Sequence, residues 1–89
     1  MKLTLNDGTV FENSHAIENG GSLFIYVQDG QSGIRDVFNA FADPEKTASI
    51  QYENMAGDTI TLTGYNRIIA VRDEGRGLIT AVLTIDRTA

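Results

Sequence analysis

Short turn-forming segments interrupt this chain at close and regular intervals, and they constrain its fold more than any other feature. Asn, Asp and Gly adopt the backbone conformations that tight turns require. β-Branched and aromatic residues lie between most of these turns, and the combination predicts antiparallel β-hairpins. The turn segments are NDG at 6–8, ENGGS at 18–22, DGQSG at 29–33, NMAGD at 54–58 and DEGRG at 73–77.

The segments between the turns predict four hairpins. Each pairs two runs rich in Val, Ile, Leu, Thr or aromatic residues across one of the turns. The segment LFIYV at 23–27 has no polar alternation, so we predict a central strand buried on both faces. The predicted hairpins join 2–5 to 9–12, the two halves of 14–29, 47–54 to 58–64, and 65–72 to 78–86 through a loop at 73–77.

One segment, SGIRDVFNAFADPE at 32–45, has helical periodicity instead. Its apolar residues recur on one face of a helix, with Ser32 as a plausible N-cap and Pro44 as the stop signal. A helix of about two and a half turns is too short to be stable alone in water. We therefore expect Phe38 and Phe41 to pack on a sheet. The apolar face comprises Ile34, Val37, Phe38, Phe41 and Ala42.

These elements predict a single domain over residues 1–89, in the order β-β-β-β-α-β-β-β-β. The fold class is α+β and mostly β: antiparallel hairpins form a sheet or a two-sheet roll, with one short helix packed on it. The chain has no cysteine, so no disulfide stabilises it. Its stability must come from packing, from hydrogen bonding or from a partner subunit.

The charge distribution disfavours two classes of partner. The net charge is −5, whereas binding to nucleic acid or to an anionic membrane relies on Lys and Arg. Residues 1–64 carry three basic and nine acidic groups, and residues 65–89 carry four and three. No apolar run approaches the ~20 residues of a membrane-spanning helix, and the first ten residues lack the apolar core of a secretory signal. We expect a protein that is cytoplasmic when it is synthesised.

The sequence gives little indication of catalysis or of metal binding. The only histidine, His15, follows Ser14, and adjacent strand residues point to opposite faces, so the two cannot form a nucleophile–base pair. Asp73 and Glu74 lie in a predicted loop where both carboxylates stay solvated and ionised. One histidine and scattered carboxylates give no spacing for zinc, and the acidic turns lack the ligand pattern of a calcium loop. We predict a non-enzymatic protein without cofactor or metal.

The strands carry more apolar surface than one short helix can cover, so we predict an exposed contact surface on the last hairpin. Hairpin edges also offer a place for strand addition. The partner is a protein or a second copy of the chain, with the arginines at the rim of the contact. The predicted interface residues are Tyr65, Arg67, Ile69, Arg72, Arg76 and Ile79.

The run MKLTLNDGTVFE…LFIYVQD…IRDVFNAFADPEKTASIQYEN…ITLTGYNRIIAV resembles small uncharacterised proteins encoded by prophages of Gram-positive gut bacteria. The matching positions are Asp7, Gly8 and Thr9 in the first turn, residues 41–47 at the helix end, and Tyr65. The resemblance implies a virion or tail-associated component, incorporated in a phage particle after synthesis. It implies no catalytic residue.

Our leading hypothesis is a phage-derived structural or assembly module that acts through an oligomeric or partner interface. The alternative is a small acidic binding protein that regulates or inhibits a host or phage protein. A third class, an enzyme or ligand binder, would require a pocket between the sheet and the helix that is lined by polar groups with unusual pKa values.

Overall fold

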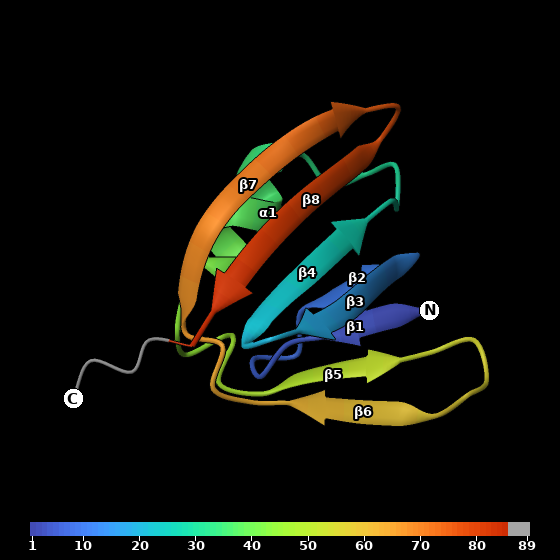
Figure 1. The fold of residues 1–89 in the computed structure, drawn as a ribbon. Coiled ribbons are helices and arrows are strands. Elements are labelled where there is room, and N and C mark those ends of the chain that lie inside the picture. The colour runs from blue at the N-terminus through green and yellow to red at the C-terminus, as the bar shows by residue number, and fades with distance from the viewer. Residues whose placement is uncertain (86–89) are drawn as a thin grey trace.

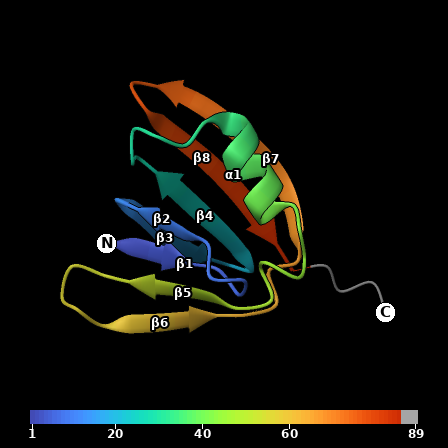
Figure 2. The ribbon, with the colours of Figure 1, turned by 180° about the vertical axis from the view of Figure 1, so that it is seen from behind.

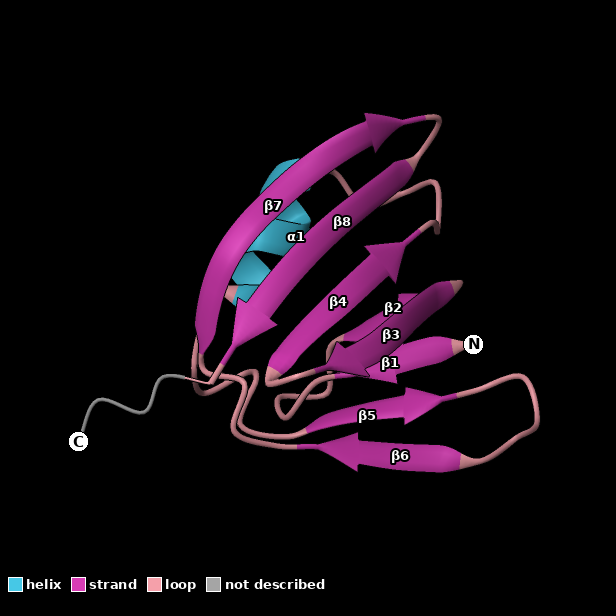
Figure 3. Cartoon of the chain, in the orientation of Figure 1, coloured by secondary structure: helices cyan, strands magenta, loops and turns pink. Residues whose placement is uncertain are grey.

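The computed structural model describes residues 1–85 as two four-stranded antiparallel sheets and one helix (Figures 1 and 3). The first sheet has the order β2-β1-β5-β6 and the second the order β3-β4-β8-β7. The predicted α+β, mostly β class is therefore confirmed, and of the two arrangements left open the chain adopts the one with two sheets. The strands are β1 (Lys2–Thr4), β2 (Val10–Glu12), β3 (Ser14–Asn19), β4 (Ser22–Val27), β5 (Ile50–Glu53), β6 (Thr59–Leu62), β7 (Arg67–Gly75) and β8 (Leu78–Thr84), and the helix is α1 (Ile34–Phe41).

The turns explain why the strands begin and end where they do. Gly20 and Gly21, between β3 and β4, have φ angles of 59° and 88°, the left-handed conformation that both central positions of a tight two-residue hairpin need. The turn between β7 and β8 has the same form, with φ of 56° at Arg76 and 78° at Gly77. This last turn is shorter than the predicted loop at 73–77, because β7 continues through Asp73 and Glu74 to Gly75. Residue 86, the predicted end of the last strand, lies outside the described residues.

The second sheet has one buried face and one outer face. On β4 the side chains of Leu23, Ile25 and Val27 are fully buried, whereas Phe24 and Tyr26 between them are only half-buried. The position of β4 inside a sheet confirms the prediction of a central strand, but burial on both faces was wrong. Packing covers only the inner face of this sheet, so the alternate side chains of β4 face outward.

Helix α1 covers part of that inner face. It packs against β7 and β8, on the side of the second sheet that is turned away from the viewer in Figure 1 and toward the viewer in Figure 2. Residues from both sheets and from the helix form one buried cluster. Phe41 of the helix stacks on Phe11 of β2, with ring centroids 5.4 Å apart, and so connects the helix to the first sheet.

The helix buries only part of the face that the sequence indicated. Its buried residues are Val37, Ala40 and Phe41, whereas Ile34 is 44% exposed and Phe38 is 48% exposed. The expectation that Phe38 is buried against a sheet was therefore wrong. The apolar stripe is broader than the surface that the sheets offer, and only its Val37–Phe41 side enters the core.

The ends of the helix depend on backbone and carboxylate contacts. Gly33, not Ser32, is the N-cap, and its backbone N–H donates to the Asp36 carboxylate at 3.0 Å. The Ser32 hydroxyl instead donates to Asp29 at 2.6 Å. At the other end Ala42 is the C-cap, so the helix ends before Pro44 as predicted.

The different burial of Phe38 and Phe41 should appear as a difference in the free energy of unfolding when each is replaced. We expect Phe41→Ala to lower the free energy of unfolding by about 3–5 kcal/mol, because it removes a fully buried ring from a small core. Phe38→Ala should cost only about 1 kcal/mol, because half of that ring is already in water. Urea denaturation of both variants tests this, and equal losses would contradict the packing of the helix.

Candidate interaction groove

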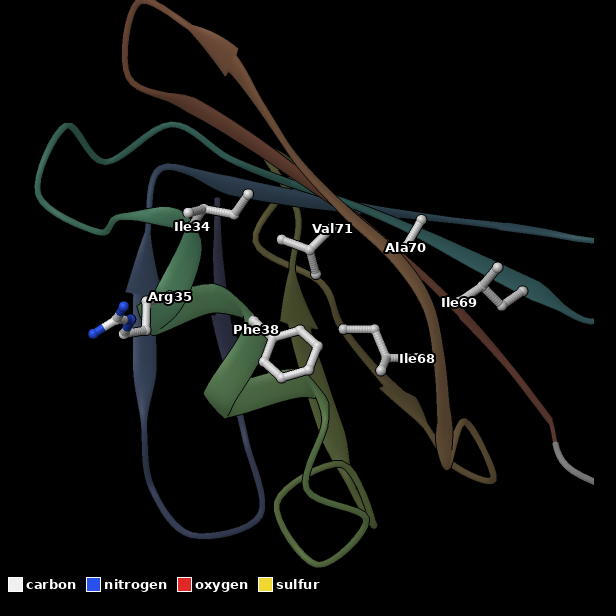
Figure 4. Close-up of a pocket in the computed structure, with 7 residues that line it drawn as sticks. All are labelled: Ile34, Arg35, Phe38, Ile68, Ile69, Ala70 and Val71. Carbon is white, nitrogen blue, oxygen red and sulfur yellow. The ribbon is translucent and has the colours of Figure 1, made fainter.

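An apolar groove of about 460 Å³ lies between α1 and β7. Figure 4 shows Ile68 and Val71 pointing toward Phe38 across this groove. One wall belongs to the helix and the other to the strand, two elements that are far apart in the sequence. The lining residues are Ile34, Arg35, Phe38, Ile68, Ile69, Ala70 and Val71.

Three large apolar side chains on this surface remain substantially in water. Ile34 and Phe38 on the helix are 44% and 48% exposed, and Ile69 on the strand is 58% exposed. Beneath them Ile68 and Val71 are half-buried and pack against the core. The groove is thus continuous with the core on one side and open to solvent on the other. Sequence analysis missed its helical wall because it assigned Phe38 to the core.

A β-bulge shapes the strand wall of the groove. The pairing of β7 with β8 jumps from Ile68↔Leu83 to Ala70↔Val82, so Ile69 is an extra residue with no partner in the ladder. A bulge bends its strand and redirects the side chains around it. The exposure of Ile69 follows from this irregularity, which the strand periodicity of the sequence does not reveal.

One basic side chain lines the groove and three more lie on β7 and its turn, although the protein as a whole is acidic. Arg35 lines it, Arg67 and Arg72 lie on β7, and Arg76 lies at the hairpin tip. The Arg72 Nε atom lies 3.4 Å from the Glu74 Oε1 atom in an exposed ion pair, which contributes little to stability. Within residues 1–85 no carboxylate forms an ion pair with any of the other three arginines.

Nearby carboxylates already have local partners. Asp36 accepts the Gly33 N–H at the helix N-terminus, and Asp73 accepts the Gly75 N–H at 2.8 Å beside the hairpin turn. These hydrogen bonds hold both carboxylates in the local backbone structure. The four arginines outnumber the acidic residues of the same elements, Asp36, Asp73 and Glu74, by one.

The six predicted interface residues divide into two groups. Arg67, Ile69, Arg72 and Arg76 are exposed on β7 and its turn, and of these only Ile69 lines the groove. Tyr65 and Ile79, both 3% exposed, are part of the core, so their assignment to a contact surface was wrong. Ile79 faces inward because it pairs with buried Val27 on the adjacent strand.

Tyr65 has a structural role in the segment that leads from β6 to β7. Its hydroxyl donates to the Glu18 carboxylate of β3 at 2.5 Å. This hydrogen bond, assisted by desolvation and by the charge of Glu18, raises the pKa of Tyr65 to about 12. This hydrogen bond holds the segment before β7 against β3, the opposite edge strand of the same sheet.

His15 lies in a second hollow of about 350 Å³, which Met1 and Tyr26 also line. Its Nδ1 atom lies 3.3 Å from the Tyr52 hydroxyl, and its ring packs edge-on against the rings of Tyr26 and Tyr52. The neighbouring Ser14 is buried, and its hydroxyl donates to the Phe11 carbonyl at 2.5 Å. The two side chains have separate partners, so this region is aromatic packing around a histidine.

Across the described range 1–85, no three or more His, Asp or Glu side chains are grouped so that they could hold a metal ion. The helix in this range is neither long nor apolar enough to cross a membrane. No family model, curated protein or solved structure matches the chain.

The hydrogen bond between Tyr65 and Glu18 predicts a pH dependence. Because folding raises the pKa of Tyr65 from 10.0 to about 12, the stabilisation is complete below pH 10 and is lost as the pH rises through 12. Spectrophotometric titration should show one late tyrosine step, which disappears in Tyr65→Phe. In Glu18→Gln this step should move toward pH 10, and an unchanged step would contradict the assignment.

Proposed function

We propose that this chain is a non-enzymatic assembly or interaction module that contacts a protein partner through the groove between α1 and β7. The observation that carries the proposal is the convergence of Ile34, Phe38 and Ile69, three exposed apolar side chains, on one surface. Exposed apolar clusters of this kind are stabilised when another protein covers them. The groove combines an apolar floor with one arginine, Arg35, in its lining, as such contacts combine an apolar centre with polar groups around it.

The potential catalytic groups support a non-enzymatic role. Asp73 and Glu74 are exposed near a hairpin turn, where they make local contacts with Gly75 and Arg72. His15 is packed between two tyrosine rings, and the neighbouring Ser14 hydroxyl donates to the Phe11 carbonyl rather than to the imidazole. General acid–base work requires a group held at a substrate site with a matched pKa, and these side chains serve the fold instead.

The resemblance to prophage-encoded proteins supports a setting in which the partner is another structural protein of a phage particle. A small domain with an apolar groove suits such an assembly, because each protein in a particle contacts its neighbours through a limited part of its surface. A second copy of the chain is the other occupant that this function allows.

Selection from a displayed library of random peptides tests the proposed function. Peptides enriched on the wild-type protein should bind Ile69→Asp at least ~10-fold more weakly, since the substitution places a charge in the apolar surface. The matched control is Ile60→Asp, which alters another exposed isoleucine on an edge strand, outside the groove. Circular dichroism verifies the fold of both variants. If nothing is enriched, or if both variants lose binding equally, the proposal fails.

Sedimentation velocity at tens of micromolar separates the two occupants. A monomer assigns the groove to a different protein. A dimer that Ile69→Asp dissociates and Ile60→Asp leaves intact assigns the groove to a second copy. A dimer that neither substitution affects places the contact elsewhere on the molecule.

A further inference from the structure

We infer that the groove binds an extended segment of a different protein, added as a fifth strand beside β7, with acidic residues opposite Arg67 and Arg72 and apolar residues between them. The inference rests on the proposed function and specifies the form and chemistry of the partner. It follows from the sheet edge, from the register of β7 and from the charges around it.

The first observation is the free edge of β7. This strand has nine residues, and it is the last in the order β3-β4-β8-β7. Its ladder to β8 uses one side of the backbone, and α1 lies across the inner face of the sheet rather than beside the edge (Figures 1 and 2). An edge strand presents N–H and C=O groups that another extended chain can pair with. Recognition by strand addition uses these groups for affinity and adjacent pockets for specificity.

The second observation is which side chains of β7 face the groove. Residues directly opposite each other in a sheet point to the same face. Leu83 and Ala81 are buried on the inner face, so their partners Ile68 and Val71 point inward. An added strand that continues this register therefore directs two of its side chains into the groove, one beside Ile68 and one beside Val71. Both have to be apolar, because the floor of the groove is apolar.

The third observation is the charge on the outer face. Arg67 and Arg72 pair with Thr84 and Thr80, which alternate with the buried residues of β8, so both arginines point outward. Ala70 lies between them in the same row. Opposite charges directly across an antiparallel pair stabilise it, and like charges destabilise it. The edge of β7 thus favours the pattern acidic, apolar, any residue, apolar, acidic in the added strand, in which the acidic residue opposite Arg72 competes with Glu74 for that arginine.

Other occupants fit these features less well. A helix has no free backbone groups along its length to pair with the edge of β7. A second copy lacks the required pattern, because no two acidic residues of this sequence are four positions apart. An extended segment of another protein with acidic and apolar residues can pair with the backbone of β7, fill the apolar groove and contact the arginines at the same time.

A peptide titration tests the inference. The probe is fluorescein-labelled Gly-Glu-Val-Thr-Val-Glu-Gly, and its matched control has Lys at both Glu positions. We expect saturable binding of the Glu peptide, at least ~10-fold tighter than that of the Lys peptide, with an affinity that falls as salt is added. Backbone N-methylation of the Glu peptide should abolish binding, because strand pairing needs the N–H groups. Amide hydrogen exchange within residues 67–72 should slow when the peptide is bound.

The double substitution Arg67→Glu and Arg72→Glu provides a charge-reversal control. Both side chains are exposed, so the fold should persist, and circular dichroism verifies it. This variant should prefer the Lys peptide to the Glu peptide. The inference is overturned if the wild-type protein binds both peptides equally, if N-methylation has no effect, or if the reversal leaves the preference unchanged.

The outcomes separate this inference from the proposed function. Display selection that enriches helical or uncharged peptides, with binding lost in Ile69→Asp, overturns strand addition and supports the groove as a contact site. A dimer that Ile69→Asp dissociates also overturns strand addition by another protein and supports the groove as a contact site, because it assigns the groove to a second copy. Failure of both the selection and the titration overturns the two together.

Discussion

The stacking of Phe41 on Phe11 is the contact on which the rest of this structure depends. Helix α1 has only eight residues and cannot persist in water without tertiary packing. Its Phe41 ring lies against β2 of the first sheet, while the helix packs on β7 and β8 of the second. This contact fixes which side of the helix is buried. The remaining apolar side chains, Ile34 and Phe38, are consequently left beside the edge of β7.

The groove is thus a consequence of how a small core is completed. One short helix and a four-stranded sheet cover the inner face of the second sheet, and the apolar surface that they leave lies along an edge strand. The basic side chains gather at the same edge, in a protein whose net charge is −5. This edge combines backbone hydrogen-bonding groups, an apolar floor and nearby arginines. Binding at this edge needs no rearrangement of the core.

Features that depend on neighbours along the chain were the ones predicted most accurately from the sequence. The hairpin turn at Gly20 and Gly21 and the end of the helix before Pro44 follow from backbone preferences of single residues, and both were predicted. The predictions failed where a side chain could lie on either side of a helix or a strand. Phe38 and Phe41 carry the same ring, yet only contact with Phe11 decides which of them enters the core. Tyr65 resembled a surface aromatic because its partner, Glu18, is 47 positions away.

The sequence by itself determined the succession of strands and the single helix, because turn residues and apolar periodicity act within a few positions of each other. It also determined the excess of apolar surface and the three arginines of the last hairpin. Only the tertiary structure decided that β1 lies between β2 and β5, that β4 pairs with β8, and that α1 turns Phe38 toward β7. These arrangements join residues that are distant in the sequence, and their energies come from packing and pairing that no local pattern records.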